Sequence, residues 1–360
     1  MSTVALLSDE PLPFEIVSAF SLLQNFKPIE SIVDGLPIGR GAIVAITGQT
    51  GHAKTTICTL LQVSLCKGLP FAGREVTKGS VLVLAGENPH DYTQHLAGQV
   101  QDLRLYPADL SRPKPEGELS VIPGTFSIDF ELDVLRAEAG RFGREFVAVF
   151  VDTSAAFYTA QDENDNVAMR RHASVLRQLS TLPGNPTVFV LSHPTKNAQR
   201  DNLLPRGGGA FLAEIDCNLT LWKDEAGIVT LHWAGKIRGP SFDPVRFELV
   251  PITLEGHLDC RQKPIVSVVA RHLPDERAEQ IAAKSFDDDD RLLVAMQKKP
   301  GASVRELAMC CGWTNGMGKP MHARADRRLK HMAGLGLAEQ DRKGKWRLTT
   351  KGTKEADRLP

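Results

Sequence analysis

The sequence predicts an α/β protein with a mostly parallel central sheet, followed by a small α+β domain at the C-terminus. Three observations predict this fold. Over residues 43–191, continuous apolar segments of strand length alternate with helical patterns, which is typical of a parallel sheet covered on both faces, and hairpin-like strands follow to residue 250. A glycine-containing loop joins the first of these strands to a helix. The segment after residue 298 is strongly basic and has its own helical periodicity.

The composition is that of a globular protein with more than one domain. The chain has 360 residues, of which 42% are hydrophobic, enough to bury a sizeable core. No apolar run is long enough to span a membrane, and the N-terminus lacks the pattern of a signal peptide. The six cysteines show no metal-binding spacing, so we expect reduced thiols in a cytoplasmic protein.

The net charge is zero but unevenly distributed. Residues 298–358 carry 15 Lys and Arg against 6 Asp and Glu, whereas the rest of the chain carries 28 against 37. A basic end on an acidic body favours a polyanion such as DNA as the partner of that end. The alternative is a charged surface that only contacts solvent.

The loop between the strand at residues 43–46 and the following helix has the pattern of a phosphate-binding P-loop. A loop that opens a helix points several backbone N–H groups at one place, and the helix dipole adds positive charge there. A nucleoside triphosphate is expected to contact Gly48, Gln49, Thr50, Gly51, His52, Ala53, Lys54, Thr55 and Thr56. Lys54 would reach the terminal phosphates, and Thr55 would hold Mg²⁺. The alternative is a chance turn between a core strand and a core helix.

One position departs from the usual pattern G-x-x-x-x-G-K-[ST], because Ala53 precedes the lysine. The backbone N–H is still available at alanine. Its methyl group matters only if the position needs a positive φ or the closest approach to phosphate.

Three further strands end in side chains suited to hydrolysis of a triphosphate. Asp152 follows the strand at residues 146–151, where a carboxylate binds Mg²⁺. Glu87 follows the strand at 80–85 and could activate a water molecule. His193 follows the strand at 187–191 and could contact the γ-phosphate. Since the carboxyl ends of parallel strands form one edge, we expect these groups to meet.

Lys236 and Arg238 follow a later strand, at residues 228–233, and a Gly-Pro turn comes after them. The two cations alternate on one side of an extended segment. Cations fixed in this way could enter the nucleotide site of a neighbouring subunit as arginine-finger groups. The alternative is an ordinary pair on the protein surface.

The order of these motifs resembles RecA-fold hexameric ATPases, and above all the RepA-type helicases of plasmids and phages, with DnaB-like replicative helicases as relatives. The resemblance covers about residues 28–250. It implies a hexameric ring with ATP and Mg²⁺ bound between subunits, in which Lys54, Glu87, His193, Lys236 and Arg238 act in catalysis. Thr55 and Asp152 match the metal ligands of that family.

In that family, two loops line the channel through which DNA passes. The first matches residues 153–166, which are acidic here, contrary to the expected DNA contact. The second matches residues 194–209, which we expect to form a long mobile loop. Its basic residues Lys196, Arg200 and Arg206 are the candidates for contacts with single-stranded DNA.

The basic C-terminal segment has three helical patterns and a short hairpin, and it resembles a winged helix-turn-helix. Residues 287–290 form an acidic run that we expect to be solvated and to cap the helix at 291–298. Ser303 and Glu306 form a capping-box pattern, and a third helix is expected at 321–333. The spacing places an apolar face and a basic face on that helix: Ala325, Leu329 and Met332 on the first, and Arg324, Arg327 and His331 on the second, with Arg328 nearby. The DNA-contacting side chains would be Arg324, Arg327, Arg328, Lys343 and Lys345. The alternative is that this domain contacts protein.

These observations divide the chain into four parts: an N-terminal segment (1–27), a RecA-like P-loop ATPase domain (28–250), a connector (251–286) and a winged helix-turn-helix domain (287–360). The expected function is a DNA-dependent ring ATPase, a replicative helicase moving on single-stranded DNA, and no membrane partner. The alternatives are a nucleotide-switched DNA-binding regulator or helicase loader, and a recombination ATPase.

Overall fold

The computed structural model describes residues 17–26, 28, 30–111, 117–141, 143, 145–158, 165–196, 198–224, 226–315, 318–341 and 344–359. The chain divides into two units, Met1–Glu30 and Ser31–Pro360. The described part of the first unit contains the short helix α1 (Ala19–Gln24). This helix begins at Ser18, whose side chain accepts a hydrogen bond from the N–H of Ser21.

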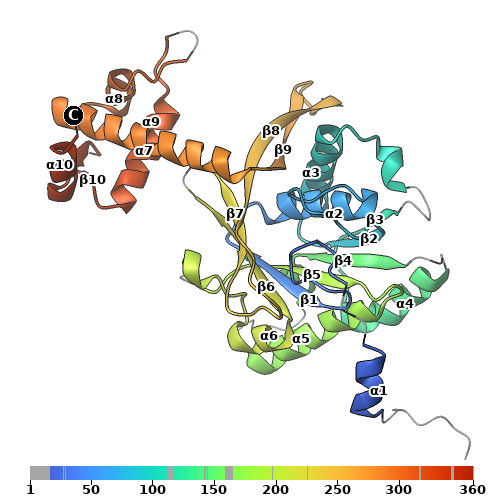
Figure 1. The fold of residues 1–360 in the computed structure, drawn as a ribbon. Helices are drawn as coiled ribbons and strands as arrows, with labels where there is room; N and C mark the ends of the chain where they lie inside the picture. The colour runs from blue at the N-terminus through green and yellow to red at the C-terminus, as the bar shows by residue number, and fades with distance from the viewer. Residues whose placement is uncertain are drawn as a thin grey trace, which may run out of the picture. The chain divides into compact units, whose positions relative to one another are not determined.

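The second unit contains a nine-stranded sheet, which confirms the predicted α/β fold class (Figure 1). Its strands follow the order β3-β2-β4-β5-β1-β6-β7-β8-β9. The first six positions of this order are parallel, and β7, β8 and β9 are added antiparallel. The bounds are β1 (Ile43–Gly48), β2 (Ser80–Ala85), β3 (Leu119–Pro123), β4 (Phe146–Asp152), β5 (Thr187–Ser192), β6 (Cys217–Lys223), β7 (Val229–Trp233), β8 (Val245–Leu258) and β9 (Pro264–His272).

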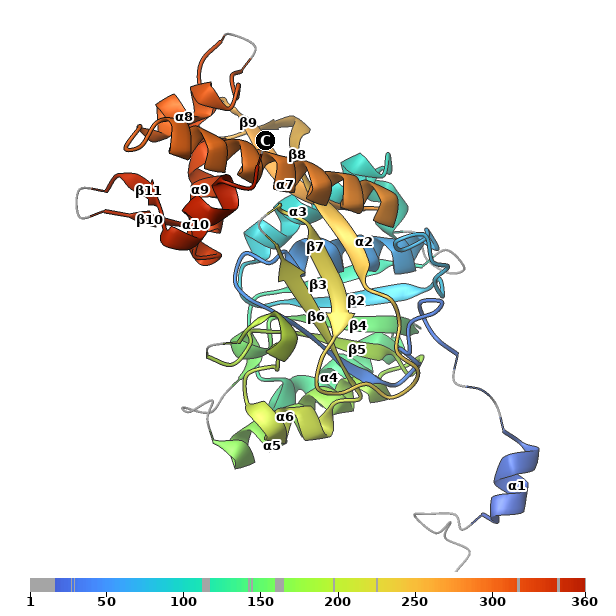
Figure 2. The same cartoon turned by 60° about the vertical axis from the view of Figure 1, so that its left-hand side comes forward.

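Helices cover both faces of the parallel part of the sheet (Figures 1 and 2). On one face lie α2 (Lys54–Lys67) and α3 (Pro89–Asp102). On the other lie α4 (Ile128–Arg141), α5 (Asn166–Gln178) and α6 (Gly208–Glu214). As a result β1, β2, β4 and β5 are buried along their whole length, which explains why they are continuously apolar in the sequence. Their carboxyl ends share one edge of the sheet.

The prediction of a connector at residues 251–286 is wrong, because β8 and β9 extend the sheet through most of it. Pro251 and Gly256 lie inside β8, and Pro264 begins β9. Such residues usually mark loops, so the sequence hid these strands. Polar side chains of α3 cover the outer edge of β9: Gln94 donates to the carbonyl of Val266, at 2.8 Å. A sheet edge covered in this way is protected from pairing with other chains.

The C-terminal region forms a separate apolar core. Its elements are α7 (Asp275–Lys298), α8 (Val304–Cys310), α9 (His322–Gly334), β10 (Ala338–Gln340), β11 (Trp346–Leu348) and α10 (Thr350–Ala356). The capping box of Ser303 and Glu306 is confirmed by reciprocal hydrogen bonds. The predicted buried face of the third helix is also confirmed, since Ala325, Leu329 and Met332 lie in this core. The sequence did not predict α10.

The acidic run at residues 287–290 was expected to cap a helix. It lies instead inside the longer helix α7. Two of its carboxylates are buried against α9. Arg324 Nη2 lies 2.6 Å from Asp288 Oδ2, and Arg328 Nε donates to Asp289 Oδ1 at 2.7 Å. Both guanidinium groups are therefore paired with carboxylates inside the domain, and Arg328 is buried, which makes these two residues weaker candidates for DNA contact than the exposed Arg327. The periodicity of α9 placed them near the basic face but could not show their partners.

The buried pair predicts a difference between two neighbouring arginines. Arg328→Ala should lower the free energy of unfolding by about 3 kcal/mol, because it leaves the buried Asp289 carboxylate without its main counter-ion. Arg327→Ala is the matched control, since Arg327 is exposed and its loss should change stability by less than about 0.5 kcal/mol. Denaturant unfolding of both variants measures this; equal losses would show that the buried pair is not stabilising the domain.

Candidate functional site

The loop between β1 and α2 has the backbone geometry of an anion-binding site. Gly51 has a φ of +80°, and α2 begins directly after Ala53, so its first N–H groups face the loop. At Gly48, a side chain would meet the carbonyl oxygen of Leu221 at 3.0 Å, which explains the glycine. Lys54 Nζ donates to the carbonyl oxygens of Gly48, at 2.8 Å, and of Gln49, at 3.3 Å. The lysine thus lies over the loop where phosphates would bind.

Ala53 adopts the left-handed conformation that its place in the motif demands, with φ of 61° and ψ of 30°. An L-residue in this region costs roughly 1–2 kcal/mol more than in a right-handed conformation. The departure from the usual glycine therefore strains the loop without removing an N–H group.

Thr55 and Asp152 form the pair of oxygen groups that Mg²⁺ requires. Thr55 Oγ1 donates to Asp152 Oδ2 at 2.9 Å, although the two residues come from α2 and from the end of β4. In the described part of the chain, no cluster of three or more His, Cys, Asp or Glu could hold a metal ion alone. One hydroxyl and one carboxylate fit Mg²⁺, which takes its other ligands from phosphate oxygens and water.

The charges in this site are set mainly by burial. Burial raises the pKa of the Asp152 carboxyl to about 6, opposed by the hydrogen bond from Thr55 and reinforced by the charge of Glu87. Burial also lowers the pKa of the Lys54 ammonium, against the attraction of Asp152 and Glu87. A cation that approaches Asp152 would therefore relieve an unfavourable buried charge.

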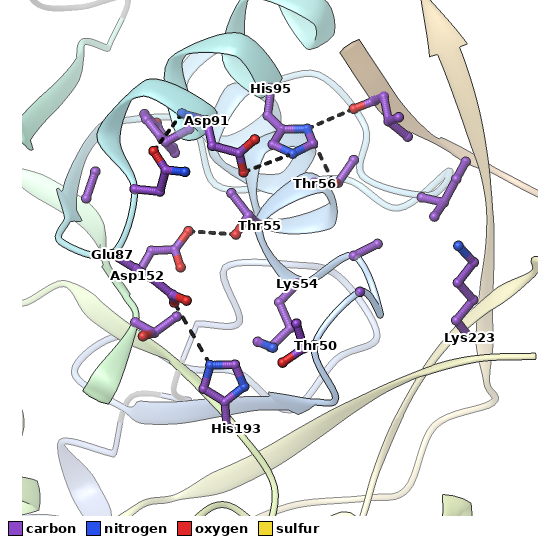
Figure 3. Close-up of a pocket in the computed structure, with 18 residues that line it drawn as sticks. Thr50, Lys54, Thr55, Thr56, Glu87, Asp91, His95, Asp152, His193 and Lys223 are labelled. Atoms are coloured by element: carbon purple, nitrogen blue, oxygen red, sulfur yellow. Dashed lines mark hydrogen bonds and ion pairs between the residues drawn. The ribbon is translucent and has the colours of Figure 1, made fainter. Parts of the chain in front are cut away.

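Glu87 and His193 meet beside this pair, as their positions at strand ends predicted. His193 Nε2 lies 4.0 Å from Glu87 Oε2. The N–H groups of Gly86 and Glu87 both donate to the carbonyl oxygen of Asp152, at 2.8 and 3.2 Å, and so fix the end of β2 against β4. Together with the P-loop, the side chains of Glu87 and His193 line a cleft of about 420 Å³ (Figure 3). The cleft brings together a cation, the hydroxyl–carboxylate pair that fits Mg²⁺, a carboxylate and an imidazole.

The cleft continues past the P-loop to residues that sequence reasoning missed. Asp91 and His95 on α3 line it, 3.5 Å apart, and Leu249 and Val268 come from β8 and β9. The spacing of Asp91 and His95 on a helix that begins just after Glu87 could have indicated them. Leu249 and Val268 gave no such signal, since their strands were taken for a connector.

His52 connects the P-loop to β6 rather than pointing at the cleft. Its Nδ1 accepts a hydrogen bond from the N–H of Lys223, at 3.2 Å, and its ring contacts Trp222 edge-on. Burial lowers the pKa of His52. The side chain thus positions the loop, and a contact with phosphate, as predicted from the sequence, would come from the backbone of this residue.

Lys236 and Arg238 lie at the opposite edge of the sheet. Lys236 Nζ donates to the carbonyl oxygens of Leu212 and Ala213, at 3.0 and 2.6 Å. Arg238 Nη1 lies 2.8 Å from Asp216, whose carboxylate accepts a hydrogen bond from the N–H of Ile43 at the start of β1. The P-loop follows the other end of this six-residue strand, about 20 Å away. Neither cation can reach the nucleotide site of its own subunit.

The segment at residues 194–209 is more structured than the expected mobile loop. Pro194 pairs with Pro205, the N–H of Arg206 donates to the carbonyl of His193, and Gln49 of the P-loop donates to the carbonyl of Ala198. The segment is therefore joined directly to the cleft. The candidate DNA contacts Lys196, Arg200 and Arg206 are exposed on it.

The remaining predicted contacts lie elsewhere. Lys345 is exposed beside β11, whereas Lys343 lies outside the described residues. Residues 159–164, the centre of the acidic loop, also lie outside them, and Asp165 caps α5. The six cysteines are unpaired, and four of them are buried. Among the described helices, none is long and apolar enough to cross a membrane.

A family model described as "AAA domain" matches residues 8–199 of the chain. The match includes the P-loop, Glu87, Asp152 and His193, and it stops before β6. No curated protein matches the chain.

The strained alanine predicts the effect of restoring the usual residue. Ala53→Gly should raise the free energy of unfolding by about 0.5 kcal/mol, since relief of the left-handed alanine exceeds the entropic cost of glycine. Nucleotide affinity should stay within a few-fold, because the N–H groups remain. Ala72→Gly is the matched control, because it tests the relief of left-handed strain apart from nucleotide binding. Ala72 has a φ of 52° and also packs partly on the core, but it lies outside the loop. Destabilisation by Ala53→Gly alone would contradict the inferred strain.

The raised pKa of Asp152 predicts a pH-dependent effect of Asp152→Asn on the nucleotide-free protein. The folded-state pKa of about 6 lies above the unfolded value of about 3.9, so the folded protein binds more protons between these values. Its free energy of unfolding therefore falls as the pH rises through that window. The variant should be more stable by up to about 3 kcal/mol above pH 7 and no more stable below about pH 4. Thermal denaturation at several pH values measures this, and a pH-independent difference would contradict it.

Proposed function

Because the match covers more than half of the chain, the protein belongs to the AAA domain family of nucleotide-hydrolysing ATPases, and we propose that it is a DNA-dependent ring ATPase acting as a replicative helicase on single-stranded DNA. The observation that carries this proposal is the separation of two sets of groups. The cleft at one edge of the sheet has the groups proposed to bind and hydrolyse ATP, and Lys236 and Arg238 lie at the other edge. A second copy of the chain would bring the two sets together.

Within the cleft, each side chain has a defined task. Lys54 and the N–H groups at the start of α2 bind the β- and γ-phosphates. Thr55 and Asp152 would hold Mg²⁺, which would neutralise the charge that develops on the phosphate oxygens. Glu87 accepts the proton of the attacking water, and His193 contacts the γ-phosphate.

Lys236 and Arg238 of the adjacent subunit supply positive charge to the transition state. Two-thirds of the Arg238 side chain is exposed, although one nitrogen contacts Asp216, so the guanidinium group remains accessible to a neighbour. The carbonyl partners of Lys236 hold that cation at the surface between α6 and β7.

Hydrolysis would act on DNA through the segment at residues 194–209. The carbonyl of His193 accepts the N–H of Arg206, and Gln49 of the P-loop contacts Ala198, so loss of the γ-phosphate would shift both attachments. Lys196, Arg200 and Arg206 would then move the bound strand through the channel.

The C-terminal domain supports a second contact with nucleic acid. Its helices and the β10–β11 hairpin have the order of a winged helix-turn-helix, in which α9 enters the major groove and the hairpin contacts the backbone. Arg327 and Lys345 are its exposed candidates among the described residues. This domain also favours the second candidate function, a nucleotide-switched DNA-binding regulator or helicase loader without unwinding activity.

The deciding experiment measures ATP hydrolysis with and without single-stranded DNA, beside the mass in solution with and without ATP. A ring helicase should hydrolyse ATP several-fold faster with DNA and assemble into a closed oligomer. Sequence-specific duplex binding without strand separation would favour the regulator. Helical filaments in electron microscopy would favour a recombination ATPase. A strictly monomeric protein whose hydrolysis ignores DNA would contradict the proposal.

Mixed subunits test the shared site directly. Lys54→Ala and Arg238→Ala should each abolish hydrolysis, and only Arg238→Ala should still bind ATP. Mixed in equal amounts, the two variants should recover about a quarter of the activity, because randomly formed interfaces join an intact P-loop to an intact Arg238. Arg261→Ala, at an exposed turn, is the control and should keep full activity. No recovery on mixing would count against a role of Arg238 in the neighbouring site.

A further inference from the structure

We propose that α3 and the β8–β9 hairpin form the nucleoside end of the cleft, where Asp91 selects a ribose over a deoxyribose, so that the preferred ligands are ribonucleoside triphosphates. This inference rests on the proposed ATPase function. It assigns a role to residues that lie outside the P-loop, the metal-binding pair and the hydrolytic groups.

The layout of the cleft fixes which end receives the nucleoside. Lys54 and the pair Thr55–Asp152 mark the terminal phosphates, and Glu87 and His193 lie beyond them, where the γ-phosphate is attacked. The rest of the triphosphate must therefore run along the first turn of α2, away from His193. Thr56 is the next residue on that turn, and its hydroxyl lies 3.5 Å from Nδ1 of His95 on α3. Figure 3 shows Asp91 and His95 on this side of the helix.

Apolar side chains line this end of the cleft. Leu249 and Pro251 point to the same side of β8, and Val268 of β9 pairs with Pro251. Leu249 and Val268 therefore share the face of the hairpin that lines the cleft. Neither side chain is fully buried. An apolar surface beside a triphosphate site suits the flat face of a base.

Asp91 is the polar group at this end. The Asp91 carboxylate would repel the phosphates of the ligand. Its place is therefore beside the nucleoside rather than beside the triphosphate. His95 holds it: Nε2 lies 3.5 Å from Asp91 Oδ2, while Nδ1 lies 3.0 Å from the carbonyl oxygen of Val268. More than half of the Asp91 side chain is exposed, so its oxygens can accept hydrogen bonds from the 2′- and 3′-hydroxyls of a ribose.

The test compares the binding of ATP, dATP and inorganic tripolyphosphate to the full-length protein in the presence of Mg²⁺. The wild-type protein should bind ATP about ten-fold more tightly than dATP, the expected effect of one hydrogen bond to a charged acceptor. Asp91→Ala should weaken ATP by that factor and leave dATP unchanged, and Asp91→Asn should fall between. Leu249→Ala should weaken ATP and dATP equally, about ten-fold, and leave tripolyphosphate unchanged.

Two variants guard against effects on folding. Val268→Thr keeps the size of the side chain and adds a hydroxyl at a partly exposed position, so it should weaken ATP and dATP a few-fold without leaving a cavity that would lower thermal stability. Val266→Ala on the same hairpin is the matched control, since its side chain is exposed and it should bind all three ligands as the wild type does.

The outcomes separate this inference from the proposed function. Equal loss of ATP and dATP in Asp91→Ala would overturn the assignment of the ribose. Loss of tripolyphosphate in Leu249→Ala, in step with ATP, would show that the hairpin only supports the fold. Wild-type protein that binds tripolyphosphate but does not distinguish it from ATP would overturn the nucleoside site alone. Wild-type protein that binds neither would overturn the ATPase function and this inference together.

Discussion

The candidate site depends on the hydrogen bond from Thr55 to Asp152. It joins two segments that lie 97 residues apart in the chain, one at the start of α2 and one at the end of β4. Asp152 is buried, and its carbonyl oxygen also receives the N–H groups that fix Glu87. A single residue therefore sets the distance between the phosphate-binding loop and the residue proposed to activate water. Its buried charge is also the reason why a divalent cation would bind there favourably.

The strand order explains why these particular groups meet. In the sequence, the strands that carry Glu87, Asp152 and His193 follow the P-loop strand at long intervals. In the sheet, β2, β4, β5 and β1 are consecutive neighbours, and all four run in the same direction. Every side chain that follows a carboxyl end is then brought to one edge, within reach of one ligand. β6 adds Lys223 to the same edge, and its partner β7 leads to Lys236 and Arg238 at the other.

The elements that a local sequence pattern determines could be predicted from the sequence. The elements that depend on pairing with distant segments could not. Strands buried on both faces are continuously apolar, so β1, β2, β4 and β5 were found together with the residues that end them. β8 and β9 contain Pro251, Gly256 and Pro264, and only their pairing and the cover from α3 make them strands. In α9, periodicity gave the buried face correctly. It could not show that Arg324 and Arg328 face carboxylates on α7, which lie 36 and 39 residues earlier in the chain.

The two edges of the sheet are coupled through β1. Asp216 accepts the N–H of Ile43 at the amino end of this strand and also contacts Arg238. The P-loop begins at the carboxyl end, so the strand connects a cation proposed to serve the neighbouring site with the loop proposed to bind the subunit's own nucleotide. In the proposed ring, phosphate in the next subunit would compete with Asp216 for Arg238. Asp216 is largely buried. If Arg238 left it, only Arg177 and the N–H of Ile43, of the three contacts named here, would still compensate the charge of its carboxylate. Exchange of this one ion pair would thus link the state of one nucleotide site to the backbone that supports the next.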